Sequence, residues 1–150
     1  MKNVFVMIPA SAGPVWFLAG VAVFALGLLT LFGCIVYASR ATSFEITPGS
    51  LRIKSGFSRR EIPLDALILE EAAAVDLRAR PDLTPTLRTN GAGLPGYLSG
   101  WFRLKDGRKA LLHVTDRRRI LYVPTRAGYV LLLSTAEGAE FLAALKRAAG

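Results

Sequence analysis

Hydrophobic residues fill one continuous segment near the start of the chain, and short runs of alternating apolar and polar residues follow it. From Val15 to Ala38 the sequence contains 24 residues without a charged side chain. About 20 apolar residues are enough for a helix to cross the ~30 Å hydrocarbon layer of a bilayer. The pattern therefore predicts a short flank over 1–14, a transmembrane helix over 15–38 and one domain over 39–150.

A cleaved signal peptide is the alternative interpretation of this segment. The apolar region of a signal peptide is only about 7–15 residues long, follows positive charge closely and ends in small residues at a cleavage site. Here Lys2 lies 13 positions upstream of Val15, and Val36, Tyr37 and Ala38 form no clear cleavage pattern. These features favour an uncleaved anchor.

Short β-rich runs bounded by turn residues follow Arg40 and predict strands. Residues 43–47 and 51–54 form a hairpin around Pro48-Gly49-Ser50, and further strands are expected at 60–62, 66–77, 97–104, 109–115, 120–123 and 129–133. Residues 70–75 suit a helix equally well by propensity. The segment Arg78–Gly96 is rich in proline and glycine and predicts a long loop.

A helical pattern closes the chain. Ser134 and Glu137 have the spacing of a capping box, and apolar residues repeat at helical intervals from Phe141 to Ala148. We expect Phe102 and Leu104 to face the core of the sheet, and Phe141 and Leu145 to dock the helix over it. The predicted fold class is mainly β, with about seven short strands and a C-terminal helix after the transmembrane segment.

Four sequence stretches resemble the bacterial pleckstrin-homology-like (PH-like) domain family, in particular its membrane-anchored members. They are FEITPGSLRI (Phe44–Ile53), REIPLDAL (Arg60–Leu67), Thr89–Thr125 and GYVLLLS (Gly128–Ser134). The resemblance implies a strongly bent antiparallel sheet in two near-orthogonal layers, with the C-terminal helix plugging one open end. It implies no particular ligand, because one fold can host many functions.

Charge is distributed very unevenly along the chain. The net charge is +8, yet Lys2 is the only charged side chain before Arg40. Five basic residues follow the apolar segment within about 20 positions, and positive flanks stay on the cytoplasmic side. We therefore expect a single-pass protein of the inner membrane with a cytoplasmic C-terminal domain.

The densest basic run is Arg117, Arg118 and Arg119, and Arg108 and Lys109 border the preceding hairpin. Such a run can simply keep a small domain soluble. Alternatively, these five residues contact acidic lipid headgroups, at about 1 kcal/mol for each basic residue near the leaflet. Nucleic acid is not expected as a partner, because no recognition helix or stacking motif accompanies the charge.

Other motifs do not support catalysis or a cofactor. Gly91-Ala92-Gly93-Leu94-Pro95-Gly96 matches G-x-G-x-x-G, but a dinucleotide site needs a strand before it and a helix after it. We interpret it as a loop in which Asn90-Gly91 turns the chain and Gly93 and Gly96 adopt positive φ. His113 is the only histidine, so neither a catalytic triad nor a zinc site is expected, and we place it in a strand near the surface.

These observations predict a membrane-anchored, non-catalytic binding module whose partner is an acidic lipid headgroup or a membrane protein. The alternative is a membrane-associated enzyme that uses the region Arg78–Gly100. Gly13, Gly20, Gly27 and Cys34 recur every seven residues, and such a stripe of small residues can also pair two transmembrane helices in a homodimer. A disulfide framework is excluded because Cys34 is the only cysteine.

Overall fold

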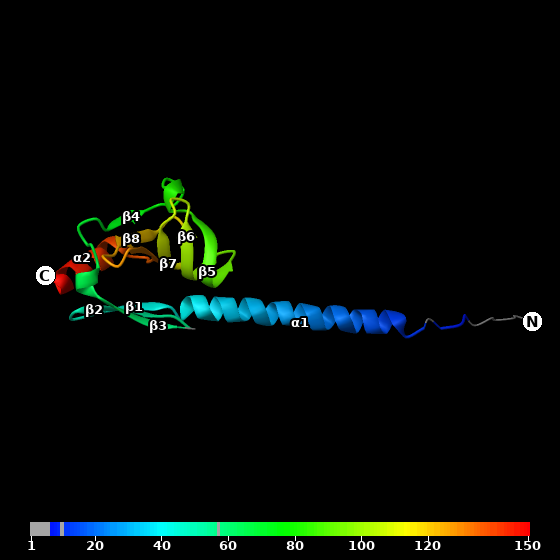
Figure 1. Cartoon of the computed structure of the whole chain (residues 1–150). Helices are drawn as coiled ribbons and strands as arrows, with labels where there is room; N and C mark the ends of the chain where they lie inside the picture. Colours follow the sequence, from blue (N-terminus) through cyan, green and yellow to red (C-terminus); the bar gives the residue numbers. More distant parts are fainter. Residues whose placement is uncertain (1–6, 10, 57) are drawn as a thin grey trace, which may run out of the picture. The chain divides into compact units, whose positions relative to one another are not determined.

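The computed structural model describes residues 7–9, 11–56 and 58–150, which form two compact units that meet at Val36 and Tyr37. The first unit consists mainly of the helix α1 (Gly13–Arg40) as far as Val36, and α1 is drawn in blue to cyan in Figure 1. Among the described residues α1 alone is long and apolar enough to cross a membrane, and a signal sequence near the N-terminus can meet the same criterion. Ala41 and Thr42 separate α1 from the first strand of the second unit.

The second unit begins with a three-stranded antiparallel sheet. Its strands, in spatial order, are β1 (Ser43–Thr47), β2 (Ser50–Lys54) and β3 (Arg59–Pro63). The predicted hairpin is confirmed, and Gly49 allows its tight turn with φ 93°. Phe44, Ile53 and Arg60 stand opposite one another across the three strands, so they share one face of the sheet.

A six-stranded sheet forms the rest of the β structure. In spatial order it contains β4 (Ala73–Val75), β8 (Ile120–Pro124), β9 (Tyr129–Ser134), β7 (Lys109–Val114), β6 (Tyr97–Leu104) and β5 (Pro85–Leu94). The mainly-β class is confirmed, but the described residues form nine strands where about seven were expected. One pair departs from the antiparallel pattern, because β9 returns between β7 and β8 and lies parallel to β7.

The loop predicted over Arg78–Gly96 is wrong for most of its length. Pro81–Leu83 forms a short 3-10 turn, and Pro85–Leu94 forms the long edge strand β5, which pairs with β6. Two register shifts, between Pro85 and Leu87 and between Arg88 and Asn90, let β5 follow β6 despite its irregular sequence. The predicted strand over 66–77 is also shorter, since Leu64–Ala66 is a 3-10 turn and only Ala73–Val75 pairs with β8.

Two apolar clusters lie on opposite faces of the six-stranded sheet. Strands β7 and β9 are buried on both faces, so Leu111 and Leu131 join one cluster and Leu112 and Leu132 join the other. The first cluster lies between the two sheets, which Figure 1 shows facing each other. Phe102 and Leu104 are buried in the second cluster, as predicted.

The helix α2 (Gly138–Ala149) closes the chain and packs on the first cluster. Leu145 is fully buried there and Phe141 packs beside it, as predicted. The predicted capping box is wrong, because Glu137 at the N-cap makes no side-chain capping bond. Ser134 ends β9 instead, and its hydroxyl accepts hydrogen bonds from the amides of Thr115 and Asp116.

Candidate functional site

The five basic residues singled out in the sequence lie in two groups at opposite ends of β7. Arg108 and Lys109 stand at its start, and Arg117, Arg118 and Arg119 follow its end in the connection to β8. Six residues of extended strand span roughly 20 Å. The fold therefore does not gather these five side chains into one patch.

The turn that carries Arg117, Arg118 and Arg119 is here called the basic turn, and hydrogen bonds to its backbone amide and carbonyl groups hold its conformation. The carboxylate of Asp116 accepts a hydrogen bond from the amide of Arg118 at 2.9 Å, and the carbonyl of Arg117 accepts one from Leu77 at 3.0 Å. All three arginines are exposed. Within the described part of the chain none of their guanidinium groups forms an ion pair, so their charge is available to an anion.

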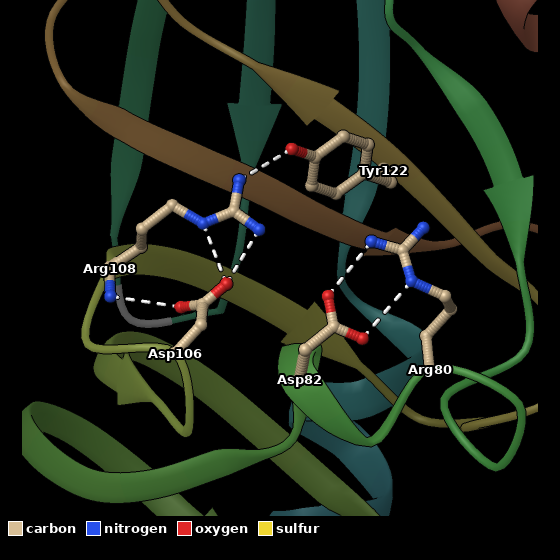
Figure 2. A network of polar contacts seen from close by, with 5 residues as sticks. All are labelled: Arg80, Asp82, Asp106, Arg108 and Tyr122. Carbon is tan, nitrogen blue, oxygen red and sulfur yellow. Dashed lines mark hydrogen bonds and ion pairs between the residues drawn. The ribbon is translucent and has the colours of Figure 1, made fainter.

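Arg108 is engaged differently, as Figure 2 shows. Its guanidinium lies 2.6 Å from a carboxylate oxygen of Asp106 and donates to the hydroxyl of Tyr122 at 2.7 Å. Beside this group, Arg80 donates two hydrogen bonds to Asp82. Burial tends to raise the pKa of Asp106, but the hydrogen bonds from the side chain and the amide of Arg108, together with its charge, outweigh burial and hold that pKa below its ordinary value.

Each of these two ion pairs lies within its own segment, and backbone hydrogen bonds join the two segments. The amide of Lys105 donates to the carbonyl of Thr84 at 2.9 Å, and the amide of Asp106 donates to the carbonyl of Asp82 at 3.2 Å. These backbone bonds connect the β6–β7 turn to the segment before β5, and the bond from Arg108 to Tyr122 connects the same turn to β8. Arg108 has a structural role here, and its charge is already compensated by Asp106.

A cleft of about 480 Å³ opens between β3 and the sheet formed by β5, β6 and β7. Arg60 borders it from β3, Ala92 from β5, Ser99 and Trp101 from β6, and His113 from β7. The guanidinium carbon of Arg60 lies 5.0 Å from the centre of the Trp101 ring, and the ammonium of Lys109 lies 4.4 Å from it. Cations this close to an indole ring are attracted by its π face.

His113 forms the polar floor of this cleft. Only 6% of the residue is exposed, so the prediction that it lies near the surface is wrong. Its strand is covered by the smaller sheet, and Phe44 contacts its ring edge to face. Burial, with a smaller effect from the charge of Arg60, lowers the pKa of His113 to about 4, and the ring is therefore neutral at pH 7.

Ser99 and His113 form a hydrogen-bonded pair in the cleft, with 3.2 Å between the Ser99 hydroxyl and Nδ1 of the imidazole. A hydrolytic triad would add a carboxylate to orient the ring. Among the described residues no aspartate or glutamate lines this cleft. The pair resembles part of such a constellation and lacks, among the residues that line the cleft, the carboxylate that would complete it.

The glycine motif lies in strands and not in the predicted loop. Gly91 of β5 pairs with Gly100 of β6, and a Cβ atom at either position would collide with the facing backbone. Gly96 has φ 77° in the β5–β6 turn, as expected, but Gly93 has no positive φ and packs against the Phe102 ring. The motif connects two strands, so it lacks the helix N-terminus on which a dinucleotide would sit.

Sequence reasoning did not place Arg60 and Trp101 in one site with Ser99 and His113. One signal was present, because strict alternation places Arg60 on the same face as the core residue Ile62. A charged residue at such an inward position requires an explanation. That Trp101 and Ser99 line the cleft depends on how β6 lies against the distant strand β3, and the local sequence does not show this packing.

The architecture defines the class of the protein: two facing sheets closed by a C-terminal helix form a PH-like module. A comparison with protein families agrees and extends this assignment, because the family model described as a bacterial PH domain matches residues 42–149. The chain belongs to the bacterial PH domain family. Neither the curated proteins nor the solved structures contain a significant match to the chain.

Proposed function

We propose that the protein is a single-pass protein of the bacterial inner membrane whose PH domain, residues 39–150, acts as a non-catalytic binding module at the cytoplasmic face. The observation that carries this proposal is the direct connection of an apolar helix to a bacterial PH domain. Tethering holds the domain near the bilayer, so a partner in or on the membrane is met at high effective concentration.

The basic turn is the proposed contact with acidic lipid headgroups. Arg117, Arg118 and Arg119 are exposed and, in the described part of the chain, form no ion pair. Arg108 is less suited to this role because Asp106 already compensates its charge, and Lys109 lies over the Trp101 ring at the other end of β7. We therefore assign headgroup contact to the basic turn alone.

The enzyme alternative finds less support. Its proposed loop is largely the strand β5, and the nearest polar pair, Ser99 and His113, has no carboxylate beside it among the described residues. With a pKa of about 4, His113 is also a weak general base at neutral pH. Binding therefore accounts better for these residues than catalysis does.

The lipid contact can be tested on the full chain in nanodiscs. A dye is attached at Thr115→Cys after Cys34→Ser removes the natural thiol, and nitroxide-labelled lipids report its distance from the bilayer. We expect strong quenching with phosphatidylglycerol that weakens as salt rises, and little with phosphatidylcholine alone. Replacing Arg117, Arg118 and Arg119 by Gln should remove up to about 3 kcal/mol of attraction, near a hundredfold in docking equilibrium.

A second triple variant serves as the matched control. Arg103, Lys105 and Lys146 are exposed, and Gln at these positions lowers the net charge by the same amount without touching the basic turn. The control should keep the quenching of the parent protein. Equal quenching in both lipid types, or equal losses in the two triple variants, would contradict headgroup contact by the basic turn.

A further inference from the structure

The cleft between β3 and β5–β6–β7 exists because two strand edges are left unpaired. In the described part of the chain β3 pairs only with β2 and β5 pairs only with β6. Between these edges the larger sheet presents small residues, Ala92 and Ser99, and the facing pair Gly91 and Gly100. A Cβ atom at either glycine would collide with the backbone of the paired strand. The strand pairing therefore keeps side chains away from these two positions in the lining of the cleft, whose volume is about 480 Å³.

Arg60 brings a positive charge to the mouth of this hollow. It continues the row of Phe44 and Ile53, whose side chains pack in or against the core, yet it is exposed at the sheet edge. It stacks on Trp101 and, among the described residues, has no carboxylate partner. An inward charge on an edge strand can also serve to prevent strand pairing with another chain, and the experiment below separates that role from ligand binding.

Ser99 and His113 supply a donor at the floor for either tautomer of the ring. A neutral imidazole carries one N–H. If the Ser99 hydroxyl donates to Nδ1, the N–H is at Nε2, for which the described residues provide no hydrogen-bond partner. If Nδ1 donates instead, the hydroxyl proton of Ser99 is left to donate elsewhere. In both cases one neutral donor remains for a bound group.

We propose that this cleft binds a carboxylate attached to a flat apolar body, with Arg60 pairing the carboxylate, the one free donor of the Ser99–His113 pair donating to it, and Trp101 covering the apolar part. One guanidinium and neutral donors match a single negative charge, and the planar fork of arginine fits a carboxylate through two parallel hydrogen bonds. The cleft volume lies in the range of small-molecule sites, about 300–1,000 Å³. This inference deepens the proposed binding function by naming a ligand class for the domain.

A free aromatic acid and the C-terminal carboxylate of a polypeptide share this chemistry. The test therefore uses four probes: phenylacetate, its neutral analogue phenylacetamide, a short peptide ending in phenylalanine, and the same peptide with an amidated end. The protein is the full chain with Trp16→Phe in phosphatidylcholine nanodiscs. Trp101 is then the only tryptophan, and His113 is the only histidine, so fluorescence and imidazole NMR signals both report on the cleft.

We expect at least one acid to bind saturably and its amide to bind at least tenfold more weakly. Arg60→Gln should weaken acid binding roughly tenfold or more, as expected when a charge-assisted hydrogen bond is lost, whereas Arg59→Gln should have no effect. Arg59 is the matched control because it precedes Arg60 and points to the opposite face of the strand. Preference for the free acid or for the peptide identifies the source of the ligand.

Ala92→Leu provides a second variant in case Arg60→Gln impairs folding, since it fills the cleft from β5 and should abolish binding. Absence of saturable binding by both acids, equal binding of acid and amide, or equal losses with Arg59→Gln and Arg60→Gln would overturn the proposal. Headgroup docking is measured separately through the basic turn. If neither acid binds in the cleft but docking to the bilayer is still observed, the cleft proposal is wrong and the proposed function is unaffected.

Discussion

His113 gives the domain a pH dependence that follows from its burial. Above about pH 6.5 the ring is neutral in both the folded and the unfolded chain, because the pKa is 6.5 when exposed and about 4 in the fold. Between these two values the unfolded chain binds a proton that the folded chain does not. The free energy of unfolding should therefore fall as pH falls from about 6.5 to 4, by up to about 3 kcal/mol.

The measurement is chemical unfolding of the full chain in neutral detergent, followed by Trp101 fluorescence with Trp16→Phe, at a series of pH values. His113→Gln should remove the decline between pH 6.5 and 4.5 whatever its effect on absolute stability. A loss at still lower pH should persist, because the hydrogen bond from Arg80 lowers the pKa of Asp82 and protonation removes that pair. The same slope in His113→Gln and parent would refute the assignment to this residue.

Some individual residues were predictable from sequence and others were not. Phe102, Leu104 and Leu145 follow simple periodicities, and their burial is confirmed. The position of the basic turn also followed from the neighbouring strands. His113 was misplaced because alternation assigns a face but not what covers it, and here Phe44 contacts its ring from a distant strand.

At the scale of secondary-structure elements, β5 shows why the loop prediction failed. Its sequence, PTLRTNGAGL, contains the proline and glycines that normally mark turns. In the fold these glycines permit the close approach of Gly91 to Gly100, and the Phe102 ring covers Gly93 from β6. Pairing with β6 stabilises β5 as a strand although its own sequence favours a loop, and this pairing cannot be deduced from the sequence of β5 alone.

Phe102 should therefore be a strong determinant of the β5–β6 pair. Phe102→Ala should lower the free energy of unfolding by about 3–5 kcal/mol, because it removes a buried aromatic ring and leaves a cavity. Arg103→Ala is the control on the exposed face of the same strand and should change stability by no more than about 0.5 kcal/mol. Equal unfolding midpoints for the two variants in the same detergent assay would show that Phe102 contributes no core packing.

At the scale of the whole molecule, the chain combines one apolar helix with one compact domain. The mainly-β class with a C-terminal helix was predictable because most strands alternate clearly and α2 repeats at helical spacing. The parallel contact of β7 and β9 was not, since it depends on β9 inserting between two strands already formed by neighbouring sequence. Placement in the membrane remains a prediction from hydropathy and flanking charge.

The central claim, a cytoplasmic PH domain on an uncleaved anchor, is tested most directly by reporters fused after Gly150. Lys2 precedes the apolar helix, whereas Arg40, Arg52, Lys54, Arg59 and Arg60 follow it closely, so the domain should stay in the cytoplasm. We predict a fluorescent GFP fusion, an inactive alkaline phosphatase fusion, and a membrane-bound product of full length. An active phosphatase fusion with a non-fluorescent GFP fusion, or a product from which the N-terminal helix has been cleaved, would contradict the account.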